Sequence, residues 1–308
     1  MSSRRLAWFF TGLTALTYLL VVFGAVVRTK GAGLACPDWP LCFGQLVPAM
    51  DFGVILEWGH RALAGIVSLG LLTGIVATWR NKAALQAVRG LLVAAVVVLA
   101  VQIVLGGLTV LHLLAFWTVS SHLVVGNAFA LTLGLIAARL WGLVRPERPR
   151  APTTAAARLT IHVTAVALFA QLVLGGLVSS QFAGLVCPQW PACAGDQWFP
   201  TFSGLMGLHI AHRLTAYALV VGFALSALTT WGQDSLGAKA RIAFGLVLAQ
   251  VALGVANVLF HLPVEVTAGH SAGAALLILT TGLMLHDLYG RPLSPPVAST
   301  MQPSPERA

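Results

Sequence analysis

A chain of 308 residues in which 58% are hydrophobic and only 9% are charged is not a soluble protein. Its formal net charge of +9 arises from 18 basic and 9 acidic residues. The basic residues fall mainly between apolar segments and at the chain ends, which indicates membrane topology and excludes a nucleic-acid partner.

Eight apolar segments of roughly twenty residues or more follow one another and predict transmembrane helices. They are continuous and lack the period-two alternation of membrane barrel strands. The expected fold class is therefore an all-α integral membrane protein. The predicted helices cover residues 6–27, 56–79, 90–110, 117–141, 159–179, 204–230, 242–260 and 264–289.

The basic residues predict the orientation of these helices. With the N-terminus in the cytoplasm, only Arg28, Lys30, Arg61 and Arg213 fall toward the opposite face. The other fourteen of the 18 lie on the cytoplasmic side, as the positive-inside rule requires, and both termini are then cytoplasmic. These fourteen are Arg4, Arg5, Arg80, Lys82, Arg89, Arg139, Arg145, Arg148, Arg150, Arg158, Lys239, Arg241, Arg291 and Arg307.

The chain repeats itself. The segment from Cys36 to Cys42 (CPDWPLC) recurs as CPQWPAC from Cys187 to Cys193, and each copy is followed by a His-Arg pair. We therefore expect two tandem four-helix bundles related by a pseudo-twofold axis along the membrane normal. Residues 1–141 form the first bundle, 142–157 a Pro- and Arg-rich cytoplasmic linker, 158–290 the second bundle and 291–308 a disordered cytoplasmic tail.

Both cysteine pairs fall in predicted extracytoplasmic loops, where an oxidising compartment permits disulfides. The two cysteines of each pair are six residues apart, and prolines bend the segment between them. This spacing predicts the disulfides Cys36–Cys42 and Cys187–Cys193.

Four histidines occupy equivalent places in the two halves. His60 and His212 lie in the first turns of the second and sixth predicted helices, and His122 and His270 in the first turns of the fourth and eighth. Two imidazoles from different helices of one bundle are the ligand set of a six-coordinate haem. The alternatives are core histidines bonded to backbone carbonyls and a zinc or copper site.

The two halves differ at one acidic position. Glu57 lies one helical turn before His60, where the second half has His209. A carboxylate on the face of a ligand histidine suits proton transfer or stabilisation of positive charge, so the first half is the expected reaction site. The other interpretations are a helix N-terminal carboxylate and a partner for Arg61. Arg28, Arg61 and Arg213 are candidate contacts for haem propionates.

These motifs resemble those of the bacterial haem A synthase family: Gly33 to Cys42 (GLACPDWPLC), the segment EWGHR around His60, and His122, His212 and His270. The resemblance extends through the eighth predicted helix. It implies that haem O is oxidised at its C8 methyl group to haem A, with the substrate near His60, His122 and Glu57. It also implies a cofactor haem b on His212 and His270, in the cytoplasmic membrane of a bacterium.

The resemblance further implies haem O synthase as a partner, together with an electron donor or acceptor and membrane lipid. It implicates Cys36 and Cys42 in function, through pocket structure or redox chemistry. The sequence leaves open homo-oligomer formation and whether oxygen comes from dioxygen or water. Two other hypotheses are a non-enzymatic di-haem electron-transfer cytochrome and a haem or solute transporter.

Overall fold

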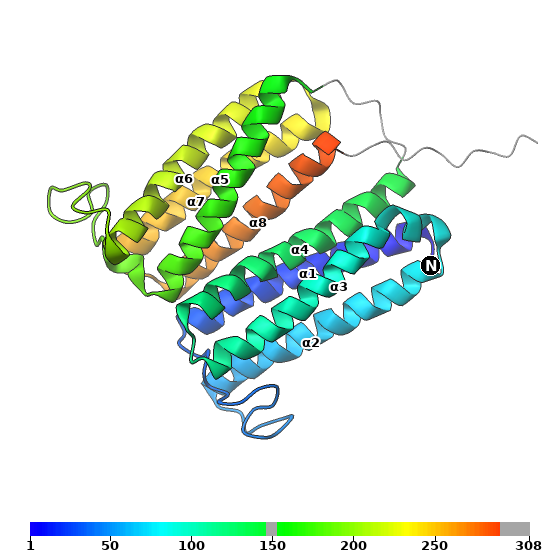
Figure 1. The fold of residues 1–308 in the computed structure, drawn as a ribbon, viewed down its shortest axis with the longest axis horizontal. Coiled ribbons are helices and arrows are strands. Elements are labelled where there is room, and N and C mark those ends of the chain that lie inside the picture. Colours follow the sequence, from blue (N-terminus) through cyan, green and yellow to red (C-terminus); the bar gives the residue numbers. More distant parts are fainter. Residues whose placement is uncertain (146–152, 290–308) are drawn as a thin grey trace, which may run out of the picture.

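The computed structural model describes residues 1–145 and 153–289, and in this part of the chain all long elements are helices. Residues 146–152 of the predicted linker and the whole predicted tail lie outside the described residues, and the two ends of the linker belong to α4 and α5. Eight long α-helices follow in order (Figure 1): α1 (Ser3–Thr29), α2 (Phe52–Trp79), α3 (Lys82–Leu111), α4 (Phe116–Val144), α5 (Ala155–Ser180), α6 (Gly204–Thr229), α7 (Asp234–Leu259) and α8 (Val264–Tyr289). A single 3₁₀ turn, η1 (Ala183–Leu185), follows α5.

All eight predicted helices are present, but most begin earlier than predicted. The side chain of Asp51 accepts a hydrogen bond from the Val54 amide and starts α2 at Phe52. Asn81 caps α3 in the same way through the Ala84 amide. The first two turns of α3 contain Lys82, Gln86 and Arg89, so hydropathy alone places the start of that helix too late. The first turn of α2 is apolar, and the Asp51 cap marks a start that hydropathy alone does not define.

The helices form two neighbouring groups, α1–α4 and α5–α8 (Figure 1). α1 and α4 pack closely in the first group. The same two helices join it to the second group, because α1 contacts α8 and α4 contacts both α5 and α8. Both disulfide loops, residues 30–51 and 181–203, connect the first and second helix of their group and lie at the same end of the molecule. We call this the cysteine end.

The buried apolar core of each group lies away from the cysteine end. In the first group its buried members come from the first half of α1 and α3 and from the later parts of α2 and α4, including Phe10, Leu71 and Ile136. The second group repeats this with residues such as Ile161 and Phe223. Large buried side chains therefore fill the far end of each group, and the end that carries the histidines is less filled.

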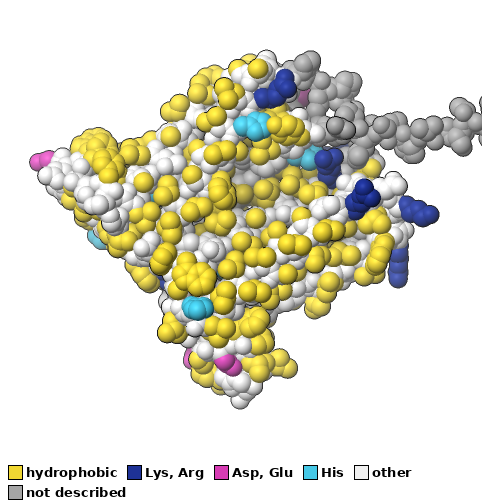
Figure 2. Space-filling view, in the orientation of Figure 1, with side chains coloured by type: hydrophobic (Ala, Val, Ile, Leu, Met, Phe, Trp, Pro, Cys, Tyr) yellow, Lys and Arg dark blue, Asp and Glu magenta, His cyan; other side chains and the backbone are white. Residues whose placement is uncertain are grey.

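The outer surface is apolar. Hydrophobic side chains cover the face shown in Figure 2, and residues such as Leu69 and Val166 project outward. Each of the eight helices is long and apolar enough to cross a membrane. The chain is therefore a multi-pass membrane protein whose outer side chains face lipid.

Both predicted disulfides are present. Cys36 is joined to Cys42 and Cys187 to Cys193, with Cα–Cα distances of 4.8 and 4.3 Å. Each loop then folds back through an isolated bridge to a glutamine, Cys42 to Gln45 in the first loop and Ala194 to Gln197 in the second. The two loops thus share one architecture.

Candidate functional site

The four candidate ligand histidines occupy matching places in their helices. His60 and His212 are each the ninth residue of a helix, because α2 begins at Phe52 and α6 at Gly204. His122 and His270 are each the seventh residue of α4 and α8. The prediction placed them in the first turns, but they lie two to three turns inside the cysteine end. For His60 the reason is the earlier start of α2, whereas α6 and α8 begin where predicted, so for His212 and His270 the depth within the helix was underestimated.

Each half brings its two histidines near each other. His60 and His122 are close enough to interact electrostatically, and so are His212 and His270. The Nδ1 atoms of all four rings are buried and have no hydrogen-bond partner among the described residues. Such buried polar atoms carry a cost unless a ligand uses the ring.

A glycine on the neighbouring helix lies against each histidine ring, a feature that the sequence analysis missed. A Cβ atom added to Gly24, Gly106, Gly175 or Gly254 would lie 3.0, 3.2, 3.1 or 3.4 Å from Cε1 of His60, His122, His212 or His270, respectively. The absence of a side chain lets each ring rest on the backbone of the adjacent helix. The shared spacing of these glycines could have been found by aligning the helices.

Three of these glycines follow a glutamine by four residues. Nε2 of Gln102 lies 3.2 Å from Nε2 of His122, and Nε2 of Gln171 lies 3.5 Å from Nε2 of His212. Gln250 donates to the carbonyl oxygen of His270 at 2.8 Å. In α1 the same position holds Leu20, so His60 lacks the amide neighbour of the other three.

The residues fit a haem with two axial histidines. Each half offers two imidazoles from different helices, with buried unpaired nitrogens, at a level where few large side chains fill the interior. In residues 1–145 and 153–289 no group of three or more His, Cys, Asp or Glu side chains could hold a bare metal ion. The donor set therefore favours a prosthetic group that needs two protein ligands over zinc or copper.

Arg61 and Arg213 hold the disulfide loops. Arg61 donates to the carbonyl oxygens of Cys36, Asp38 and Leu41 at 2.7–3.3 Å. Arg213 donates to the equivalent carbonyls of Cys187, Gln189 and Ala192 at 2.8–3.1 Å. With a fourth bond to the residue one turn earlier, each guanidinium uses four of its five N–H donors. A propionate contact by either arginine remains a prediction.

The fourth bond distinguishes the two halves. Glu57 is buried, receives a hydrogen bond from the Cys36 amide at 2.7 Å and forms an ion pair with Arg61 at 2.5 Å. In the second half His209 accepts from Nε of Arg213 at 3.2 Å. Glu57 therefore joins the ligand helix to the first disulfide loop, which realises the Arg61 pairing considered from sequence. Its catalytic role remains a prediction.

Arg28 lies at the junction of the two groups. Its guanidinium donates to the carbonyl oxygens of Ser179 and Ser180 at 3.0 and 3.4 Å and lies over the ring of Phe182. These contacts tie the end of α1 to the end of α5, and a role toward a propionate remains a prediction.

Within the first loop, Asp38 accepts hydrogen bonds from the Gly44 and Phe43 amides at 2.7 and 2.6 Å. The bond from Gly44 contributes most to lowering the pKa of this carboxyl below its usual value, and Phe43 and Arg61 act in the same direction. The carboxylate thus fixes the turn that follows Cys42.

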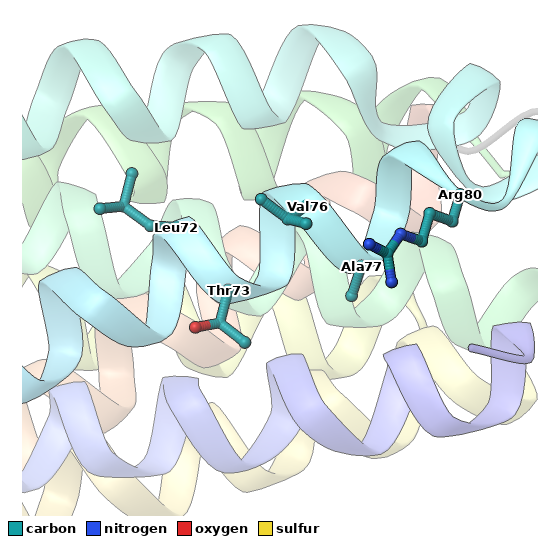
Figure 3. Close-up of a pocket in the computed structure, with 5 residues that line it drawn as sticks. All are labelled: Leu72, Thr73, Val76, Ala77 and Arg80. Carbon is teal, nitrogen blue, oxygen red and sulfur yellow. The ribbon is translucent and has the colours of Figure 1, made fainter.

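A shallow groove of about 400 Å³ runs along α2 toward the end opposite the cysteine loops (Figure 3). It is lined by Leu72, Thr73, Val76, Ala77 and Arg80. None of the predicted site residues lines it, so it is separate from the histidine pairs.

The fold and the site define a class: multi-pass membrane proteins of two four-helix units, each with a histidine pair near one end. A family profile, COX15-CtaA, described as cytochrome oxidase assembly protein, matches residues 7–53 and 50–281. The chain belongs to this family.

Curated relatives match nearly the whole chain. A heme A synthase of Shewanella oneidensis is 32% identical over 90% of this chain and 94% of its own length. Heme A synthases of Lysinibacillus sphaericus and Symbiobacterium thermophilum are 29% and 30% identical, over 89% and 78% of this chain and 92% and 81% of their own lengths.

Proposed function

We propose that this protein is a haem A synthase, an oxidoreductase that converts the C8 methyl group of haem O to the formyl group of haem A. The observation that carries the proposal is the repeated histidine pair in a chain of this family, whose relatives bear that name. The product serves terminal oxidases of the cytochrome c oxidase type.

The reaction requires electrons to leave the substrate. Overall, R–CH₃ + H₂O gives R–CHO with release of four electrons and four protons, whether by two hydroxylations and dehydration or by another order of steps. A bound haem supplies one-electron redox chemistry that protein side chains lack. An external electron acceptor is therefore part of the proposal, and haem O synthase is the proposed source of substrate.

We assign the substrate to the first half and the cofactor haem b to the second. His212 and His270 would hold haem b, and His60 and His122 would hold haem O beneath the first disulfide loop. Two features support this assignment: Glu57 is present only in the first half, and Leu20 leaves His60 without the glutamine neighbour of the other three histidines. The first half thus has a carboxylate, Glu57, one turn before a ligand histidine, and that histidine, His60, has no glutamine beside it.

Glu57 would act from beside the substrate. Its carboxylate is held by Arg61 and by the Cys36 amide, which together fix its position between α2 and the first disulfide loop. A fixed negative charge can stabilise positive charge that develops at the methyl carbon, or orient a proton acceptor there. The first disulfide loop therefore acts as part of the site by holding this carboxylate.

The membrane orientation is part of the same proposal. The cysteine end would face outward from a bacterial cytoplasmic membrane, with both termini in the cytoplasm. The support is the basic residues at the opposite end, such as Arg5, Arg80, Lys82 and Lys239.

The test is expression of the full chain with a haem O synthase, followed by chromatography and mass spectrometry of extracted haems. We expect haem A from the wild type, unmodified haem O from Glu57→Gln, and haem A again from Glu265→Gln, an exposed acidic residue of α8. A wild type with a bis-histidine spectrum and no modified haem would instead identify a di-haem cytochrome.

A further inference from the structure

We propose that the seam between α2 and α3 is the lateral port through which the prenylated porphyrin passes between lipid and the first pocket, and that a Trp190–Tyr217 latch closes the equivalent seam of the second half. This inference rests on the proposed function. It explains why one half would exchange its haem and the other would keep it.

The first observation concerns the residue five positions after each ligand histidine of α2 and α6. In the second half this residue is Tyr217, whose hydroxyl accepts a hydrogen bond from Nε1 of Trp190 at 3.0 Å. In the first half it is Gly65, and a Cβ atom added there would meet nothing within 4 Å. At this position the second half has an aromatic side chain bonded to its loop, and the first half has an exposed glycine with open space beside it.

The second observation concerns the adjacent helices. Gly107 follows the glycine that supports His122, and Val255 follows the glycine that supports His270. The indole of Trp39 lies on Gly107, 3.1 Å from where a Cβ would be. Trp39 and Trp190 occupy the same place in the two loops, but among the described residues Trp39 has no hydrogen bond like that of Trp190. Trp39 therefore rests on α3 by packing alone.

The third observation is the packing of the helices. α2 and α3 approach each other less closely than α6 and α7 do. In the second group the loosely packed pair is α5 and α8, but α4 contacts both of these helices. The weakly packed pair of the second group, α5 and α8, is therefore covered by α4. The weakly packed pair of the first group, α2 and α3, has no such helix over it among the described residues and faces lipid.

A shallow hollow on α2, lined by residues of that helix alone, lies beyond Gly65 on the side away from the cysteine end. Leu72 and Val76 follow Gly65 by seven and eleven residues, which places them on the same side of the helix. In Figure 3, Leu72 points to one side of α2, and Thr73 and Ala77 to the other. Eleven residues of helix span about 16 Å, which is of the order of an extended farnesyl chain. The porphyrin could therefore leave through the seam while its tail follows α2.

The test measures haem transfer and does not depend on turnover. Full-length protein in liposomes is mixed with vesicles that carry haem O, and uptake is followed by absorbance. Gly65→Tyr should slow uptake about tenfold, the effect of about 1.4 kcal/mol added to the barrier. Gly65→Ala, which fills only open space, should match the wild type. The retained spectrum of haem b in the second half reports that Gly65→Tyr is folded.

The reverse variant tests the latch. Tyr217→Gly should make haem b of the second half exchange with isotopically labelled haem b about tenfold faster than in the wild type, and Tyr217→Phe, which loses only the hydrogen bond, roughly threefold faster.

Uptake by Gly65→Tyr at the wild-type rate, or unchanged haem b exchange in Tyr217→Gly, would overturn the proposal. A wild type that takes up haem O at the expected rate but forms no haem A would refute the proposed function and leave the port intact.

Discussion

Replacing Gly175 by alanine should weaken haem binding in the second half. The new Cβ would lie 3.1 Å from Cε1 of His212, closer than the 3.4–4 Å of ordinary contact. The ring must therefore move by about 0.3–0.5 Å, which approaches the roughly 0.5 Å tolerance of a preorganised site. Losing a contact that orients a metal-binding side chain typically lowers affinity about 10–100-fold, and we expect haem b affinity to fall by a factor in that range.

The assay is titration of haem b into purified protein, followed by the low-spin absorption bands. Gly254→Ala, whose Cβ would lie 3.4 Å from Cε1 of His270, should have a smaller effect. Gly245→Ala in α7 is the control, since nothing lies within 4 Å of its Cβ. If Gly175→Ala bound haem b as tightly as Gly245→Ala, the close contact between glycine and ligand would have no role in holding the ring.

Two further predictions concern the loops. The Cys187–Cys193 disulfide should be reduced faster in Arg213→Lys than in Arg241→Lys. A lysine ammonium cannot contact the three loop carbonyls and His209 together, and the loop should lose about 1–3 kcal/mol of stability. An equal reduction rate in both variants would contradict the clamp. For Asp38, the lowered pKa means that its carboxylate stabilises the loop above its usual pKa of 3.8 and that this contribution is lost as pH falls through the folded pKa. Hydrogen exchange at the Phe43 and Gly44 amides should therefore rise at acid pH more in the wild type than in Asp38→Asn, and parallel profiles would refute this.

The sequence predicts most of the architecture because its signals are local. Hydropathy locates all eight helices, and the spacing of Cys36 and Cys42 predicts their bond. The repeated histidines are visible in the same way. What hydropathy misses are polar first turns, such as the start of α3 after Asn81.

The interior contacts of the site could not be predicted in this way, because they join residues that are distant along the chain. The packing of Gly175 on His212, the seat of Trp39 on Gly107 and the bond from Trp190 to Tyr217 depend on how neighbouring helices are rotated. The sequence makes Arg61 a candidate contact for a propionate and a possible partner for Glu57. Its loop carbonyl partners become apparent only when the fold brings the loop over α2.

Spectroscopy of the purified protein can show whether the paired histidines of each half clamp a haem. We predict low-spin bis-histidine absorption and electron paramagnetic resonance signals in the wild type, with the resident signal lost in His212→Ala and kept in His60→Ala. A protein that stays colourless when haem is supplied, or a His212→Ala variant with the full low-spin signal, would contradict the account.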